Sequence, residues 1–298
     1  MKHRPSPSYF LRLLISYLLV LFLPTAFIYL LFSDLLFKEM KTRIEADNDL
    51  LSYTFEENIR NVMEACDGVI ENLSYYHVVV PFALTKYPSR AIDLKDSLQK
   101  YMVTNDVMDE IGVYFRMDHY IYTNKSSYRL ENYIAYQEFK EEYGEAFLEL
   151  IKELQEPCFF KGEKRNGGYA LLYIRPYLFE SGVEGAIWFV LNQDELERLM
   201  ADRPGNTRKT ALFDATNMFL LGELPEGINR DTITMLLSKA EAAGNMVSEE
   251  REYRIEVRTM PEYGLYYVQA VPDRQLYARL GEERKKYLFI MGVVMLAG

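Results

Sequence analysis

The chain contains few of the residues on which several classes of protein depend. It has two cysteines, three histidines and one tryptophan in 298 residues. Two cysteines cannot build a disulfide framework or a structural zinc site with cysteine ligands. His3, His77 and His119 are not spaced as metal ligands are, so we expect no metal site.

The two cysteines leave two alternatives open. Cys66 falls on a predicted apolar helix face, and Cys158 follows Pro157 at the start of a predicted strand. Outside the cell they could form one disulfide, whereas as two buried thiols they would be inert. The sequence does not decide between these alternatives.

Motifs of catalysis and nucleotide binding are also absent. We find no P-loop, no Gly-x-Gly-x-x-Gly, no His-Glu-x-x-His and no Gly-x-Ser-x-Gly. The glycine-rich run 161–168 lacks the Gly-Lys-Ser/Thr order that holds phosphate, which favours a surface turn. No pair of carboxylates stands out as an acid–base couple. We therefore expect no enzyme, no catalytic residue and no cofactor.

Positive charge is in deficit. The chain has 34 basic and 44 acidic residues and a net charge of −10, which argues against binding of nucleic acid. Hydrophobic residues at 49% and charged residues at 26% are typical of a folded protein. Six of the basic residues lie before residue 13 or at 284–286, so the segment 33–283 is more acidic than the whole chain. That acidity suits a solvated domain outside the cytoplasm.

An uncharged apolar run covers residues 13–32 near the N-terminus. At 1.5 Å per residue these twenty residues span about 30 Å, the thickness of the hydrocarbon core of a bilayer. No small-residue cleavage site follows the run, which favours an uncleaved membrane helix over a signal peptide. Lys2, Arg4 and Arg12 precede it and place the N-terminus in the cytoplasm.

A second apolar run, 287–298, follows Arg284, Lys285 and Lys286. Its twelve residues are too few to span a bilayer, and we interpret them as the truncated start of a second membrane helix. The alternative is a C-terminal helix packed on the domain. The two ends together predict a protein of the cell membrane, in contact with lipid, with residues 33–286 outside the cell.

One long helix is predicted from Asp34 to Leu73, which contains no proline. Its apolar residues recur at steps of three and four, as on one face of a helix. These residues are Leu51, Phe55, Ile59, Val62, Cys66, Val69 and Leu73. We expect this face to pack on its own domain, and pairing into a homodimer nearer the membrane, around Met40 and Ile44.

Beyond this helix the same order of elements occurs twice. A hairpin, a helix, a second hairpin and a helix are predicted at 111–124, 133–154, 169–192 and 193–200. After a loop at 203–206 the order returns at 209–221, 228–243, 253–271 and 273–286. This pattern predicts an α/β (α+β) fold with two PAS-like units on a shared helical spine.

The predicted parts of the chain follow from these patterns. They are a cytoplasmic N-terminus 1–12, a transmembrane helix 13–32, a long stalk helix 33–75, a membrane-distal unit 76–203, a membrane-proximal unit 204–272, a return helix 273–286 and a truncated second transmembrane helix 287–298.

The order of elements resembles the double Cache sensor domains of bacterial transmembrane receptors. The run 185–196, Gly-Ala-Ile-Trp-Phe-Val-Leu-Asn-Gln-Asp-Glu-Leu, resembles the end of a Cache sheet, where an apolar strand enters an acidic helix start. The run 10–24 is similar to the opening of membrane-anchored AraC-type regulators of Gram-positive bacteria, and of their sensor histidine kinases. The resemblance implies signal transduction. It favours an AraC-type output, which binds DNA and regulates transcription, over a histidine kinase output.

The resemblance also implies what such a domain binds. We expect a small extracytoplasmic ligand, such as a carbohydrate or an organic acid, or a binding protein that carries one. Amino-acid-binding Cache domains share a Tyr/Arg/Trp/Asp signature that does not occur here with matching spacing, so an amino-acid ligand is not expected. An envelope assembly protein without a ligand is the alternative.

Aromatic residues and arginines concentrate on the predicted strands of the first unit. The candidate ligand-binding residues are Tyr114, Arg116, Tyr122, Tyr173, Arg175 and Trp188. Aromatic rings offer flat walls, and arginine offers forked donors to oxygen atoms. Because side chains alternate along a strand, Tyr114 and Arg116 should share a face, as should Tyr173 and Arg175. The alternative is that the apolar members of the group fill a core.

Overall fold

The structure is a computed structural model. It describes residues 7–75, 84, 87–103, 105–116, 120–178, 184–200, 208–250 and 252–274, together with 281, 285, 286, 289 and 290. The chain divides into two compact units, residues 53–271 and residues 1–52 with 272–298. The predicted turn at 117–119, the loop at 203–206 and most of the predicted helix 273–286 lie outside the described residues.

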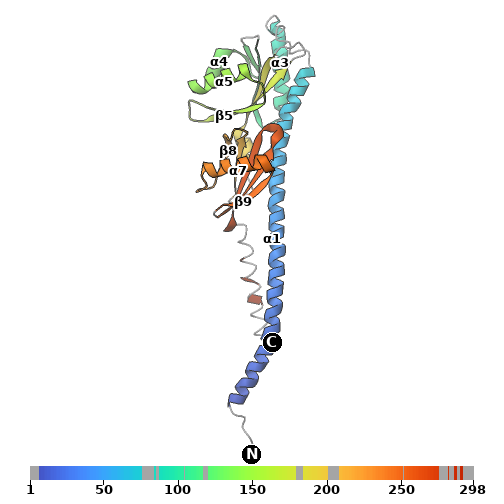
Figure 1. Cartoon of the computed structure of the whole chain (residues 1–298). Helices are drawn as coiled ribbons and strands as arrows, with labels where there is room; N and C mark the ends of the chain where they lie inside the picture. The colour runs from blue at the N-terminus through green and yellow to red at the C-terminus, as the bar shows by residue number, and fades with distance from the viewer. Residues whose placement is uncertain are drawn as a thin grey trace, which may run out of the picture. The chain divides into compact units, whose positions relative to one another are not determined.

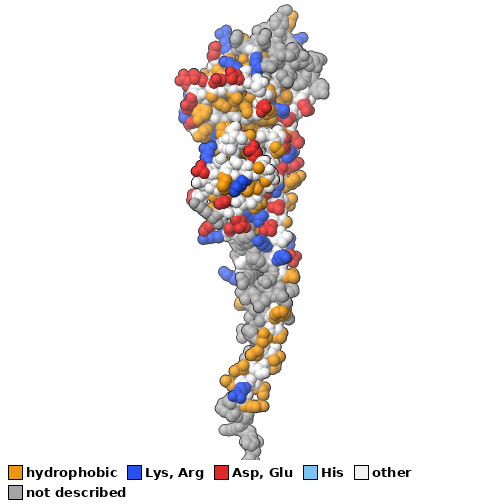
Figure 2. Space-filling view, viewed as in Figure 1, with side chains coloured by type: hydrophobic (Ala, Val, Ile, Leu, Met, Phe, Trp, Pro, Cys, Tyr) orange, Lys and Arg blue, Asp and Glu red, His pale blue; other side chains and the backbone are white. Residues whose placement is uncertain are grey.

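Helix α1 runs from Pro7 to Tyr75 and contains the residues predicted as a stalk. Near its N-terminus many apolar side chains are exposed, and they cover this stretch in Figure 2. Across the described residues, no helix is both long and apolar enough to cross a membrane. The predicted membrane helix 13–32, several of whose side chains lie outside the described part, is therefore not confirmed.

The first sheet, to which the labelled strand β5 of Figure 1 belongs, has six antiparallel strands in the order β3-β2-β1-β6-β5-β4. Its strands are β1 (Met108–Phe115), β2 (Tyr120–Thr123), β3 (Ser127–Arg129), β4 (Cys158–Glu163), β5 (Tyr169–Leu178) and β6 (Glu184–Leu191). One face packs on α1 and α3 (Pro88–Val103). The other face is covered by α4 (Leu130–Tyr136) and α5 (Glu141–Glu153).

The second sheet has five strands in the order β8-β7-β11-β10-β9. Its strands are β7 (Lys209–Asp214), β8 (Phe219–Gly222), β9 (Met246–Glu250), β10 (Tyr253–Met260) and β11 (Leu265–Pro272). Helix α7 (Arg230–Ala243) packs on one face of this second sheet, and the 3-10 turn η1 (Pro261–Tyr263) links β10 to β11. Helix α6 (Gln193–Met200) comes earlier in the chain, directly after the first sheet. Two antiparallel sheets with helices confirm the predicted fold class.

The predicted helix 133–154 is two helices in the structure. Helix α4 ends at Tyr136, and Glu138 has a positive φ of 57°. Phe139 then forms a β-bridge with Lys164 before α5 begins. Because a left-handed residue and a bridge both interrupt helical hydrogen bonding, the helix cannot continue through 137–140.

The apolar face of α1 packs against both sheets. Six of its seven predicted members are buried, and Leu51 is 39% exposed. On the first sheet Arg175 pairs with Asp67 of α1, and on the second the ring of Phe55 stacks on Tyr267 at 4.3 Å. Arg258 reaches Glu56 at 3.5 Å. Residues 53–75 therefore form one wall of a core shared by the two sheets.

A lysine also joins the sheets directly. Lys161 of β4 donates to the backbone oxygen of Leu220 in β8 at 2.7 Å. Its ammonium lies 4.8 Å from the ring centres of both Tyr169 and Phe219. Burial lowers the pKa of Lys161, and the two ring faces and the carbonyl offset part of the loss of water.

Both cysteines are free thiols, Cys66 buried and Cys158 half-buried. The alternative of a disulfide is therefore not seen in the structure. Burial raises the pKa of both thiols, that of Cys158 to about 11 with a further contribution from Asp214. At neutral pH both stay protonated and weakly reactive.

Gly112 in β1 tests the close packing around Trp188 of the first sheet, and Gly68 in α1 is the control. A Cβ at Gly112 would lie 2.2 Å from the indole of Trp188, whereas a Cβ at Gly68 in α1 would meet no atom within 4 Å. We expect Gly112→Ala to lower the free energy of unfolding by about 1–3 kcal/mol. Gly68→Ala should raise it by about 0.5–1 kcal/mol, because alanine restricts the unfolded chain. Urea unfolding of both variants measures the difference, and a Gly112→Ala protein as stable as the parent would contradict this packing.

Candidate functional site

Three of the six predicted site residues face α1. Tyr122 packs 5.9 Å from the ring of Phe115, and Tyr173 packs 5.0 Å from that of Phe159. Arg175 shares their side of the sheet through its ion pair with Asp67. Tyr173 and Arg175 thus lie on one face, as strand alternation predicted.

The other three lie on the side of α4 and α5. Tyr114 and Trp188 belong to the core beneath these helices, and Trp188 is fully buried. Arg116 donates to the backbone oxygen of Leu154 at 2.8 Å, just after α5. The sheet therefore separates the six residues into two groups of three, and their binding of a ligand stays a prediction.

The group around Trp188 includes a buried carboxylate, Glu110, which the sequence did not single out. Strand β1 pairs with β6 as Met108 with Leu191 and Glu110 with Val190, so β1 carries one extra residue at Asp109. Such a bulge re-aims the side chain that follows it. Met108 joins the core on α1, whereas Glu110 turns to the α4 side.

Glu110 is 1% exposed and accepts hydrogen bonds on both oxygens. Its Oε1 accepts from the hydroxyl of Tyr133 and from Nε2 of Gln137, each at 2.8 Å. Its Oε2 accepts from the hydroxyl of Tyr136 at 3.1 Å and lies 3.4 Å from Nζ of Lys125. A buried carboxylate needs such partners because removing its water costs several kcal/mol.

Aromatic rings surround this carboxylate. Nε1 of Trp188 donates to the hydroxyl of Tyr133 at 2.9 Å, and the ring of Tyr128 stacks on that of Tyr136 at 4.5 Å. Tyr133 is fully buried and Tyr136 is 38% exposed, so the contacts lead from the core to the surface. We call Glu110, Lys125, Tyr128, Tyr133, Tyr136, Gln137 and Trp188 the Glu110 site.

The tyrosines of the Glu110 site remain protonated at neutral pH. Burial, and then the charge of Glu110, raises the pKa of both Tyr133 and Tyr136. Burial and the hydrogen bond with Tyr136 raise the pKa of Tyr128 to about 12. The hydroxyls of Tyr133 and Tyr136 can therefore act as donors to the carboxylate throughout the physiological range.

One signal in the sequence could have found part of this site. Tyr136, the last residue of α4, and Gln137, directly after it, follow Tyr133 by three and four residues and lie on the same side. A polar stripe on a helix that covers a sheet indicates a polar partner beneath it. Glu110 itself gave no signal, because it directly precedes the predicted strand 111–124.

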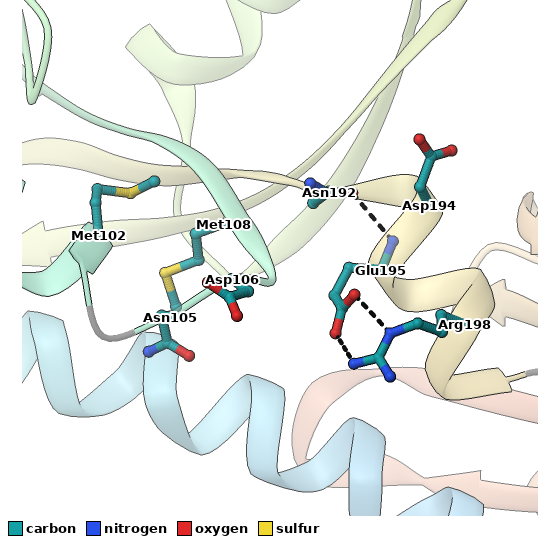
Figure 3. A pocket seen from close by; sticks show the side chains of 8 residues that line it. All are labelled: Met102, Asn105, Asp106, Met108, Asn192, Asp194, Glu195 and Arg198. Atoms are coloured by element: carbon teal, nitrogen blue, oxygen red, sulfur yellow. Dashed lines mark hydrogen bonds and ion pairs between the residues drawn. The ribbon is translucent and has the colours of Figure 1, made fainter.

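Apart from the Glu110 site, a hollow of about 470 Å³ lies beside the bulge (Figure 3). Its lining residues are Met102, Asn105, Asp106, Met108, Asn192, Asp194, Glu195 and Arg198. Oδ1 of Asn192 accepts from the backbone nitrogen of Glu195 at 3.0 Å, and Glu195 holds Arg198. Nδ2 of Asn192 donates to Asp109 at 3.0 Å, which ties the start of α6 to the bulge. Among the described residues, no cluster of histidine, cysteine and acidic side chains could hold a metal ion.

Comparisons with known proteins give a fold. No family model and no curated protein matches the chain. The extracellular domain of soHK1S-Z6, which is named as a histidine kinase, is similar with a TM-score of 0.54 and 12% identity, over 81% of this chain and 98% of that one. The extracellular domain of a second such kinase, vpHK1S-Z8, has a TM-score of 0.52 and 10% identity, over 81% of this chain and 95% of that one. The ligand-binding domain of the Campylobacter jejuni chemoreceptor Tlp3, in complex with L-norvaline, has a TM-score of 0.49 and 11% identity, over 80% of this chain and 93% of that one.

At such low identity the two kinase domains show the fold alone. They extend over four fifths of this chain and nearly all of their own length. The likeness therefore includes both sheets and is not confined to one of them. The chain has the fold of these extracellular domains, in agreement with the predicted resemblance to double Cache domains.

The hydroxyl of Tyr133 is the centre of the Glu110 site, since it joins Glu110 to Trp188. We expect Tyr133→Phe to lower the free energy of unfolding by about 1–3 kcal/mol, because the buried groups of Glu110, Trp188 and Gln137 each lose a hydrogen-bond partner. It should also shift the emission of Trp188, the single tryptophan. Tyr143→Phe in α5, outside the network, is the control and should change neither. Unchanged emission and stability in Tyr133→Phe would show that the network does not form.

Proposed function

We propose that the chain is the extracytoplasmic ligand-sensing region of a bacterial transmembrane signalling protein. The fold shared with two extracellular domains of histidine kinases supports this proposal. The acidic composition, with a net charge of −10, suits a solvated location. The observation that carries the proposal is the buried Glu110 site in the first sheet.

A buried carboxylate is a poor device for stability alone. Its desolvation costs several kcal/mol, and well-packed apolar side chains of similar volume are often as stable or more so. The pKa values of its partners Tyr133 and Tyr136 are raised, and groups with perturbed pKa values concentrate at functional sites. Tyr133 and Tyr136 of α4 and Gln137 directly after it supply three partners of Glu110, and the fourth, Lys125, comes from an exposed turn. We therefore propose that ligand recognition takes place at the Glu110 site.

A signal from this site would reach α1 through β1. Glu110, Gly112 and Tyr114 of β1 face α4, whereas Ile111, Val113 and Phe115 pack in the core shared with α1. A displacement of β1 at the Glu110 site therefore also displaces the side chains that contact α1. A ligand can shift the equilibrium between the displaced and the undisplaced arrangement of β1 only by binding one of them more tightly than the other.

The membrane anchor formed by the start of α1 and the output module of the signalling protein belong to the same proposal. Exposed apolar side chains along α1, among them Phe10, Leu13 and Val20, would be covered by lipid. We keep dimer pairing near Met40 and Ile44 as part of it. The output is an AraC-type regulator or a histidine kinase, and the kinase domains of similar fold give the second at least equal support.

A ligand screen on the full chain in detergent tests this proposal. Carbohydrates, organic acids, amines and amino acids are added one class at a time, and thermal unfolding and Trp188 emission are recorded. At least one class should raise the unfolding temperature of the parent and of Glu145→Gln, an exposed α5 variant, but not that of Glu110→Gln. If no class stabilises the parent, an envelope assembly protein without a ligand becomes the better account.

A further inference from the structure

An exposed lysine balances the buried charge of Glu110. Nζ of Lys125 lies 3.4 Å from Oε2, but the Lys125 side chain is 48% exposed and that of Glu110 only 2%. Oε2 therefore lies just beneath the surface, under a side chain that can leave. Oε1, by contrast, is held from within by Tyr133 and Gln137.

The turn that carries Lys125 fixes its backbone and leaves its side chain free to move. The backbone nitrogen of Thr123 donates to the oxygen of Ser126 at 2.8 Å. The hydroxyl of Thr123 accepts from the backbone nitrogens of Lys125 and Ser126, each at 3.1 Å. A lysine on such a turn can withdraw its ammonium by rotating side-chain bonds, without any change in β2 or β3.

The surroundings of Oε2 favour a cation. The rings of Tyr128 and Tyr136 are stacked next to it, and Tyr133 meets Tyr128 edge-on with ring centres 5.8 Å apart. Aromatic faces carry negative charge and attract ammonium groups. The hydroxyl of Tyr136, which donates to Oε2, is a further polar group at this position.

We propose that the Glu110 site binds the ammonium group of a small amine, which replaces Lys125 on Oε2. This inference rests on the proposed function and names the ligand class. Exchange of one ammonium for another keeps the buried charge neutral, and the bonds to Oε1 are retained. The organic acid expected from the sequence would bring a second negative charge beside Glu110, and a carbohydrate would leave the carboxylate without a counter-charge.

The test uses three probes of similar size on the full chain: n-butylamine, which is protonated at neutral pH as a lysine side chain is, neutral 1-butanol and anionic butyrate. Binding is followed by calorimetry and by Trp188 emission. We expect butylamine alone to bind. Lys125→Met, which removes the competing ammonium and keeps an unbranched side chain one atom shorter, should bind it about tenfold more tightly. Lys152→Met, at an exposed position of α5, is the control and should bind butylamine with the affinity of the parent.

Glu110→Gln, with the same shape and no charge, should lose butylamine binding, whereas Glu145→Gln should retain it. If another ligand class stabilises the parent but butylamine binds neither the parent nor Lys125→Met, the amine assignment is wrong and the sensing proposal stands. If butylamine binds equally to the parent, Lys125→Met and Glu110→Gln, the site is elsewhere and the inference is overturned. If no compound of any class binds, both proposals fall.

Discussion

The packing of one helix face against two sheets is the constraint on which the unit 53–271 depends. Each sheet has a helical layer of its own on one side, α4 and α5 or α7, but both need residues 53–75 of α1 to cover the other. Removal of that face would expose the apolar side of both sheets at once. The polar contacts of Asp67 and Glu56 at its edges then fix each sheet at its own level along the helix.

This arrangement gives the first sheet two faces of different composition. The α1 face is a continuous apolar core with ion pairs at its margin. The α4 face holds tyrosines, a glutamine and a carboxylate around Trp188. Strands β1 and β6 belong to both faces, so they are the elements through which one could influence the other.

Periodicity explains what could be predicted from the sequence and what could not. Steps of three and four in α1, and apolar runs in β5, β6 and β11, predicted those elements because burial determines their pattern. Strand β9 was missed, and only the start of β4, at Cys158, was predicted, since an edge strand is half-exposed and mixes polar with apolar residues. The candidate residues were chosen by type, and strand alternation alone could not show that Tyr122 and Trp188 belong to opposite faces. Glu110 was missed because it lies one residue before the predicted strand 111–124, directly after the bulge.

The bulge at Asp109 determines which side chains β1 presents to each face of the first sheet. It lets Met108 enter the apolar core against α1 while Glu110 faces α4. If the pairing were regular and residues 110–115 kept their faces, Met108 would turn towards α4 and the carboxylate of Asp109 would point into that apolar core. The irregular pairing thus accommodates one additional residue without placing a charge among apolar side chains.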